Sequence, residues 1–182
     1  NPVTTDFVDV VVEPNSSQTI DWNTFGVNGS NTARVEVSSF PTIDFNSRIQ
    51  YLIQYPHGCV EQITSGVFPQ LYLADVMDID NTRKEAMQKN VNAGIQKLGS
   101  YQLANGGVSY WPGNSNADDW GTSYAGHFLL EAEKKGYVLP ISFKQKWISY
   151  QQAEAKKWRY YQQYNNDFAQ AYRLYTLALA GV

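Results

Sequence analysis

The stretch of residues 55–62, which reads YPHGCVEQ, constrains the fold of this chain more than any other feature. Pro56 and Gly58 interrupt regular secondary structure, because proline lacks a backbone N–H and glycine permits unusual backbone angles. An apolar-periodic run from Ile63 to Met77 follows at once and predicts a helix. The stretch is therefore a sharp turn that opens into a helix.

Cys59 and Gln62 lie three positions apart in this turn and form the candidate reactive pair. Residues three apart face the same side of a helix, so we expect the thiol to lie against the side-chain amide. If the sulfur displaces ammonia from that amide, the product is an internal thioester, which is an activated acyl group. The alternative interpretation is a buried and inert cysteine, the usual state of a single free thiol.

The same stretch resembles the thioester signature Pro-x-Gly-Cys-x-Glu-Gln of the α2-macroglobulin and complement family. With its flanks it is most similar to the bacterial α2-macroglobulins. The matching residues are Pro56, Gly58, Cys59, Glu61 and Gln62, followed by Thr64, Ser65, Phe68 and Pro69. The resemblance implies that Gln62 is the acyl donor and Cys59 the leaving group. The other three motif residues would support the bond.

The resemblance implies a broad-spectrum endopeptidase inhibitor rather than an enzyme. A lysine amine or a hydroxyl of a target protease would attack the Gln62 acyl group once and leave the protease covalently trapped. Neighbouring domains of the parent chain and aromatic packing would keep water from the bond. The aromatic residues close to the motif in sequence are Tyr51, Tyr55, Phe68 and Tyr72. The family implies no cofactor and an extracytoplasmic location, periplasmic or at the cell surface; whether a lipid anchor holds the parent stays open.

The composition excludes several other classes of function. The 182 residues suffice for one good core, and a net charge of −3 gives no electrostatic case for nucleic-acid binding. The sequence has no apolar run long enough for a membrane span and no signal peptide. The single cysteine excludes an internal disulfide. The abrupt ends indicate a piece excised from a longer protein.

Residues 1–40 have the pattern of a β segment. The β-branched run Phe7–Val12 and the alternating run Thr32–Val37 each predict a strand, and a turn signal at Asn28–Asn31 lies between them. In the family resemblance this segment is part of a CUB-like sandwich that precedes the thioester domain. Two strands are too few for a sandwich, so we expect an incomplete sheet.

Residues 41–182 are predicted to be helical. Six helices are expected. The first begins near Asp44, the second runs from Ile63 to Met77 with a kink at Pro69, and the third begins at Asp80 or Thr82. The fourth spans 119–135, the fifth spans 142–161, and the sixth starts near Asn166. This fold class is mostly α. The resemblance implies the N-terminal half of an α/α-toroid, with about six helices that alternate between two rings.

A short sequence pattern that occurs twice in the chain, an internal repeat, supports repeated helix pairs. Asp119 precedes Tyr124 by five positions, as Asp167 precedes Tyr172, and each acid is followed by an aromatic residue. A glycine-rich link, Gln102–Gly107, joins two of the helices and resembles the links of the toroid. The last helix is expected to hold Phe168, Tyr172, Tyr175 and Leu179.

Several other residues invite a functional interpretation, and each has a structural alternative. Glu61 can polarise the glutamine or act as a first-turn acid that favours the helix dipole. His57 can act as a base beside Cys59, whereas His127 lies in an apolar helical stretch that favours a core histidine. The pair Asp118-Asp119 suggests a metal or diphosphate site, but adjacent acids at a helix start are more often caps.

Aromatic and basic clusters favour structural roles. The rings of Tyr110, Trp111 and Trp120 can stack on a ligand, but packing around the Gly106-Gly107 loop is the simpler interpretation. The lysine pairs at 134–135 and 156–157 are expected to be solvated faces. No set of cysteine, histidine and aspartate has zinc spacing, so no metal is expected.

Two other functions stay open on the sequence alone. One is a cysteine acyl-transferase or hydrolase that uses Cys59 with His57 or His127, although an oxyanion loop and a residue to orient the histidine are not evident. The other is a non-catalytic helical module whose aromatic face binds peptide or glycan. Half a toroid also leaves apolar surface uncovered, so we expect the chain to self-associate.

Overall fold

The computed structural model describes residues 4–35, 37, 39, 51–160 and 166–182. The chain divides into two compact units, Asn1–Ile43 and Asp44–Val182. Each unit is described by itself.

The first unit contains no β-strand in its described residues, 4–35, 37 and 39. The predicted strands at Phe7–Val12 and in the described part of 32–37 are therefore not formed, although the turn at Asn28-Gly29 is present. A strand needs a partner for its backbone groups and a core for its apolar face. The side chains of Phe7 and Val11 are about four-fifths exposed, at 80% and 82%. The assignment of residues 1–40 to a partial CUB-like sandwich stays a prediction.

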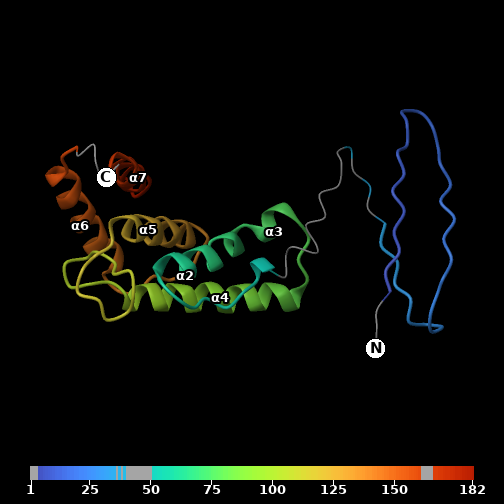
Figure 1. Ribbon diagram of the computed structural model, residues 1–182, viewed down its shortest axis with the longest axis horizontal. Helices are drawn as coiled ribbons and strands as arrows, with labels where there is room; N and C mark the ends of the chain where they lie inside the picture. Colours follow the sequence, from blue (N-terminus) through green and yellow to red (C-terminus); the bar gives the residue numbers. More distant parts are fainter. Residues whose placement is uncertain (1–3, 36, 38, 40–50, 161–165) are drawn as a thin grey trace. The chain divides into compact units, whose positions relative to one another are not determined.

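The second unit is helical (Figure 1). Its elements are α2 Val60–Val67, the short 3₁₀ helix η1 Pro69–Leu71, α3 Leu73–Val76, α4 Asn81–Ser100, α5 Asp119–Lys134, α6 Phe143–Lys157 and α7 Asp167–Leu179. The helix expected to begin at Asp44 lies outside the described residues, apart from Tyr51 and Leu52, which are helical. The prediction of a mostly α chain is confirmed.

Proline breaks the second predicted helix more completely than a kink would. The helix expected over Ile63–Met77 ends at Val67 and is followed by η1 and α3. Pro69 has no N–H to bond to residue 65, and its ring would clash with the carbonyl there. The chain continues in a 3₁₀ turn instead, in which Tyr72 N–H donates to the Pro69 carbonyl at 3.0 Å.

Side-chain caps fix where the longer helices begin. Asp80 caps α4, because its carboxylate accepts from the Arg83 N–H at 2.9 Å, which decides between Asp80 and Thr82. Asp118 caps α5 in the same way, by accepting from the Gly121 N–H at 2.6 Å. The Asp118 cap fixes where the link between α4 and α5 ends, whereas the Asp80 cap lies at the opposite end of α4.

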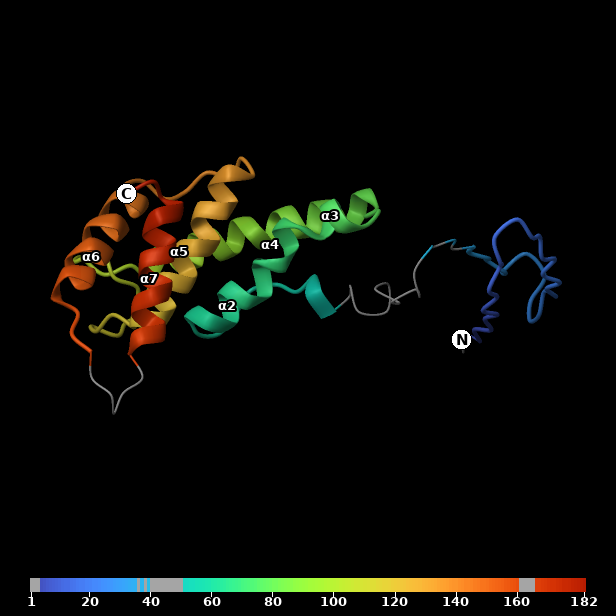
Figure 2. The ribbon, with the colours of Figure 1, turned by 90° about the horizontal axis from the view of Figure 1, so that it is seen from above.

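The helices form two layers (Figures 1 and 2). Helix α5 lies between α2 and α7 and contacts both. Helix α4 packs on α2 and α5, and α6 packs on α5 and α7. When η1 and α3 are counted as the continuation of α2, the successive helices alternate between a layer of α2, α5 and α7 and a layer of α4 and α6. This alternation is expected for an α/α-toroid.

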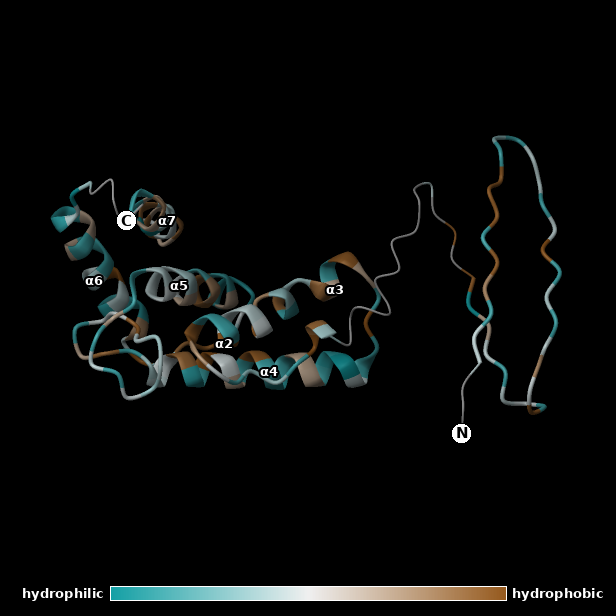
Figure 3. Ribbon diagram, viewed as in Figure 1, coloured by the Kyte–Doolittle hydropathy of each residue, from teal (hydrophilic) through white to brown (hydrophobic). Residues whose placement is uncertain are grey.

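A continuous apolar core lies between the layers. Helix α4 has both hydrophobic and hydrophilic residues along its length (Figure 3), as an amphipathic helix does. Its predicted stripe of Met87, Val91, Ile95 and Leu98 is buried. Two glycines let the layers approach closely. A Cβ on Gly94 would lie 2.9 Å from Val67, and one on Gly126 would lie 2.2 Å from the indole of Trp147.

Helix α7 buries mainly polar side chains. Its buried residues are Gln170, Arg173, Thr176 and Leu177. Phe168 and Tyr175 are 75% and 51% exposed, whereas Leu179 is partly buried against the core. This face meets polar side chains of α5 and α6, whereas Tyr172 packs beside it on the rings of Trp120 and His127 of α5.

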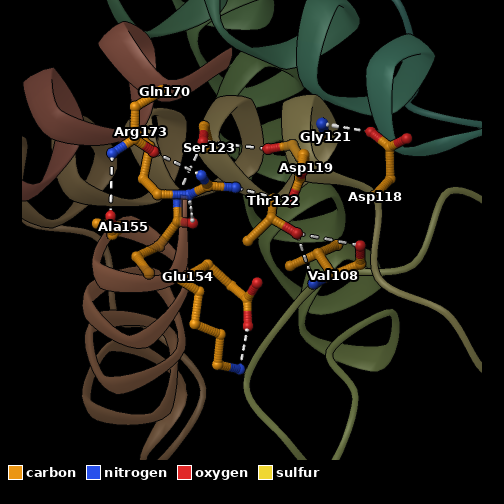
Figure 4. A network of polar contacts seen from close by, with 12 residues as sticks. Val108, Asp118, Asp119, Gly121, Thr122, Ser123, Glu154, Ala155, Gln170 and Arg173 are labelled. Carbon is orange, nitrogen blue, oxygen red and sulfur yellow. Dashed lines mark hydrogen bonds and ion pairs between the residues drawn. The ribbon is translucent and has the colours of Figure 1, made fainter. Parts of the chain in front are cut away.

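The polar side chains surround the guanidinium of Arg173, whose side chain is 3% exposed (Figure 4). Its Nη2 lies 2.7 Å from Asp119, its Nε donates to Gln151 at 3.0 Å, and its Nη1 donates to Gln170 at 2.8 Å. Gln151 in turn donates to the Ser123 hydroxyl at 2.9 Å. A buried charge requires such partners, so α7 can dock in only one rotation.

We predict that Asp119→Ala lowers the free energy of unfolding by about 2 kcal/mol, because it removes the carboxylate partner of the buried Arg173 guanidinium, although the Asp119 side chain itself is 61% exposed and partly screened by solvent. Asp167→Ala is the matched control. Asp167 is the corresponding first residue of α7, and its side chain is exposed. Its loss should cost less than about 1 kcal/mol, the size of a helix-dipole effect. Urea unfolding followed by circular dichroism measures both, and equal losses would contradict the role given to Arg173.

Candidate functional site

Cys59 and Gln62 face each other at the start of α2. Cys59 is the N-cap of the helix, in extended conformation with φ −75° and ψ 174°. The Gln62 Oε1 accepts a hydrogen bond from the Cys59 backbone N–H at 3.0 Å. The Cys59 side chain lies over the backbone N–H of Gln62, so the two residues form a reciprocal capping box. The structure brings together the pair that the sequence singled out.

Gly58 makes room for the glutamine amide. A Cβ at this position would lie 2.0 Å from the Gln62 Oε1, and the backbone has φ +103°, which side chains rarely allow. Both facts require glycine. The supporting role expected for Gly58 thus has a steric basis.

Two side chains of α4 hold the segment that leads into the turn. The Lys97 ammonium donates to the Pro56 carbonyl at 2.7 Å and lies 4.6 Å from the centre of the Tyr55 ring. The Tyr101 hydroxyl donates to the Gly58 carbonyl at 2.8 Å. Pro56 is buried, and its carbonyl is anchored by Lys97. The backbone before Cys59 is therefore fixed from outside its own helix.

Glu61 directs its carboxylate to Tyr110. The Tyr110 hydroxyl donates to Glu61 Oε2 at 3.0 Å, and the Tyr110 carbonyl accepts from the Val60 N–H at 3.0 Å. Hydrogen bonds to Cys59 and Glu61 raise the pKa of Tyr110 above its usual value. Glu61 is also a first-turn acid of α2, as its structural interpretation held.

The link between α4 and α5, residues 101–118, positions Tyr110 beside Glu61 at the start of α2. The Gln102 amide donates to the carbonyls of Gly106 and Phe143, at 3.2 and 3.0 Å, and so fastens the link to α6. Gly106 lies so close to α6 that a Cβ would be 2.2 Å from the Lys146 carbonyl oxygen. The link then returns past the end of α4, where the Ser109 N–H donates to the Tyr101 carbonyl at 3.0 Å.

The aromatic residues that reach the motif differ from those suggested by the sequence. Phe68 and Tyr72 pack on α5, where the Tyr72 hydroxyl donates to Glu131 at 2.6 Å. Tyr51 is 74% exposed and Tyr55 is 51% exposed. Cys59 is nevertheless only 3% exposed. Tyr101 and Tyr110 contact the turn, and only the glycine-rich link beside Tyr110 hinted at this in the sequence.

The described structure gives neither histidine a contact with Cys59. His57 is exposed, and its Nδ1 lies 2.9 Å from the Tyr55 carbonyl oxygen. His127 packs on Phe68 with ring centres 4.9 Å apart, and its Nδ1 lies 2.9 Å from the Tyr172 hydroxyl. His127 thus has the packing and hydrogen-bond partner expected of a structural histidine, although it is only partly buried.

The remaining candidates have structural partners. Asp118 caps α5, and Asp119 pairs with Arg173. The rings of Trp120 and Tyr172 have centres 4.9 Å apart. Lys134 pairs with Glu131, Lys135 with Asp75 and Lys157 with Glu154, while Lys156 is exposed. Within the described residues no group of three metal-ligating side chains occurs, and no helix is long and apolar enough to cross a membrane.

Comparisons of the sequence with known proteins give matches within one protein family. The sequence model of the A-macroglobulin TED domain matches residues 32–179. An alpha-2-macroglobulin of Escherichia coli K12 is 34% identical over 108 residues, which are 57% of this chain and 6% of that protein. One from Xylella fastidiosa Temecula1 is 32% identical over 118 residues, which are 63% of this chain and 7% of that protein.

Solved structures agree with the sequence comparison. A crystal structure of native Escherichia coli alpha-2-macroglobulin, from domain MG7 to the C-terminus, has a TM-score of 0.59 and 27% identity, covering 76% of this chain and 23% of that one. Salmonella alpha-2-macroglobulin reacted with methylamine has a TM-score of 0.63 and 29% identity, covering 78% and 10%. The chain therefore spans a small part of the proteins that it resembles.

We predict that Gly58→Ala disrupts the turn, because the added methyl group and the Gln62 amide need the same space. Cys59 should become reactive toward iodoacetamide. Gly66→Ala in α2 is the control, since a Cβ there meets nothing within 4 Å. That change should raise the free energy of unfolding by up to about 1 kcal/mol, the helix-propensity gain. Protection of Cys59 in both variants would contradict the steric role of Gly58.

We also predict that His127 makes the fold sensitive to mild acid. Burial lowers the pKa of His127, and Lys134 adds to the effect, although Glu131 opposes it. The unfolded chain then binds a proton that the folded chain resists, so stability falls as the pH drops below about 6.5. His127→Gln should flatten the dependence of unfolding free energy on pH between about 7 and 5.5. An unchanged slope would contradict this.

Proposed function

Because the chain belongs to the A-macroglobulin TED domain family, we propose that Cys59 and Gln62 form an internal thioester that traps a target protease covalently. The protein that carries the chain would then be a broad-spectrum endopeptidase inhibitor. The observation that supports this most directly is the reciprocal capping box of Cys59 and Gln62. It holds the sulfur and the carboxamide on the same side of a buried turn.

The thioester would form by attack of the Cys59 sulfur on the side-chain carbonyl carbon of Gln62. The C–S bond forms, the C–N bond breaks, and ammonia leaves with the thiol proton. Negative charge develops on Oε1 during this step. The Cys59 backbone N–H already donates to this oxygen at 3.0 Å, and the start of α2 adds the positive end of its dipole.

The thioester would open by attack of a lysine amine or a hydroxyl from the protease. The new bond joins the nucleophile to Gln62, the C–S bond breaks, and the sulfur takes up a proton as the free thiol of Cys59. The acyl group stays on the protease, so the site is used once. The protein therefore acts as a trap and not as an enzyme with turnover.

Burial supports the proposal, because water would hydrolyse the same bond. Cys59 is 3% exposed, and Lys97 and Tyr101 hold the turn against α4. The relative from Salmonella was solved after reaction with methylamine, an amine nucleophile. Neighbouring domains of the parent would complete the shield and cover exposed apolar residues such as Phe168. The chain without them would self-associate.

The wider setting follows from the family and belongs to the same proposal. Target proteases are the partners, met in the periplasm or at the cell surface. A cysteine hydrolase is disfavoured, because the described contacts leave Cys59 without a histidine base. An aromatic-lined binding module would leave the reciprocal contact of Cys59 and Gln62 without a role.

We predict that the peptide containing residues 59–62, from the protein at its natural length, is lighter by one ammonia. Methylamine should add to Gln62 and release one titratable thiol at Cys59. Cys59→Ser and Gln62→Asn are the matched controls, since the first removes the sulfur and the second shortens the amide side chain by one methylene group. Neither should take up methylamine. A wild-type peptide whose mass is not lower by one ammonia refutes the thioester. Repeated hydrolysis of an ester substrate by the protein would instead indicate an enzyme.

A further inference from the structure

Two hydrogen bonds meet on the peptide group that joins Gly58 to Cys59. The Tyr101 hydroxyl donates to the carbonyl oxygen of this group at 2.8 Å, and the N–H of the group, which belongs to Cys59, donates to Gln62 Oε1 at 3.0 Å. A peptide group is planar, and this one is trans, so its C=O and N–H point in opposite directions. Holding the oxygen therefore also sets the direction of the N–H.

The peptide group needs an external hold because a glycine precedes it. Gly58 has φ +103°, and glycine has the greatest backbone freedom of any residue. Rotation of the peptide group about the single bonds on its two sides would turn the Cys59 N–H away from Gln62 Oε1. The hydrogen bond from Tyr101 opposes that rotation. It also polarises the peptide group, which strengthens the N–H as a donor.

Tyr101 is itself firmly placed at the C-terminal end of α4. The residue is 7% exposed, and its backbone carbonyl accepts from both the N–H and the hydroxyl of Ser109, at 3.0 and 3.1 Å. Burial raises the pKa of the Tyr101 hydroxyl, and the neighbouring Cys59 raises it further. The hydroxyl therefore keeps its proton in mildly alkaline solution and remains a donor to Gly58.

The other anchors of the segment act before this peptide group. Lys97 donates to the Pro56 carbonyl at 2.7 Å, and the Gln70 amide donates to the Gln54 carbonyl at 2.9 Å. Both hold the approach to the turn. Tyr101 differs from them because it contacts the peptide group that carries the donor to Gln62.

We propose that Tyr101 is a positioning residue for the thioester chemistry, because it aims the Cys59 N–H at the acyl oxygen of Gln62. The proposal rests on the thioester function above. Negative charge develops on this oxygen when the Cys59 sulfur attacks the glutamine, and again when an amine attacks the thioester. A donor that is fixed in advance stabilises this charge in both steps. Tyr101 thus acts on formation and on opening through the same N–H.

The test compares Tyr101→Phe with the wild type, in the protein at its natural length. Methylamine should open the thioester of the variant about tenfold more slowly, because the donor remains but is less well aimed. Removal of a whole oxyanion donor costs more, roughly a hundred- to a thousandfold. If Tyr101 only shielded the bond, the variant would instead react faster than the wild type.

Infrared difference spectra, recorded before and after reaction with methylamine, give a second readout. The band that disappears is the carbonyl stretch of the thioester. In Tyr101→Phe this band should lie at higher frequency than in the wild type, because the hydrogen bond to the carbonyl oxygen is weaker. A merely structural role for Tyr101 would not move the band.

Tyr137→Phe is the matched control, since Tyr137 packs against the core from the connection between α5 and α6. It should match the wild type in rate and in band position. Less thioester in Tyr101→Phe at an unchanged free energy of unfolding also supports positioning, since formation uses the same donor.

Three results would overturn the role of Tyr101 while the thioester of the wild type stands. They are an equal or faster rate in Tyr101→Phe, an unshifted carbonyl band, and a loss of thioester that accompanies a lowered free energy of unfolding. A wild type that forms no thioester refutes the proposed function itself, and the role of Tyr101 with it.

Discussion

The hydrogen bond from the Cys59 N–H to the Gln62 side-chain oxygen, at 3.0 Å, is the contact on which the site depends. It starts a helix and aligns two reactive groups at once. Most helices use a serine, threonine or aspartate for this purpose, because an oxygen satisfies the free N–H groups of the first turn. A cysteine with a glutamine at the third position satisfies the same need. The requirement for glycine at position 58 follows, because the amide oxygen occupies the space of a side chain.

A turn of this kind is not rigid by itself, and the surrounding helices supply what it lacks. Lys97 and Tyr101 come from the last turns of α4, and Tyr110 comes from the link that follows. The link is tied in turn to α6 through Gln102. The site therefore rests on the packing of the two layers, and a change far from Cys59 in the sequence can alter its geometry.

The docking of α7 shows how the same local sequence can serve different contacts. Asp119 and Asp167 occupy the same position in the internal repeat. Each is followed directly by an aromatic residue and, five positions on, by a tyrosine. Asp119 meets the buried Arg173, whereas the side chain of Asp167 is exposed. Because a buried guanidinium accepts only a few arrangements of partners, one ion pair selects the face of α7 that turns inward.

The sequence alone indicated the helices and the pairing of Cys59 with Gln62, because these depend on residues three or four positions apart. It left open whether Asp80 or Thr82 caps α4, and it predicted a kink at Pro69 where the helix ends at Val67. Only the tertiary structure decided which face of α7 is buried and that Tyr110 reaches Glu61 from 49 residues away. Those contacts join segments that meet only after the layers pack. The strands expected in the first unit failed for a related reason, since local preference forms no strand without a partner.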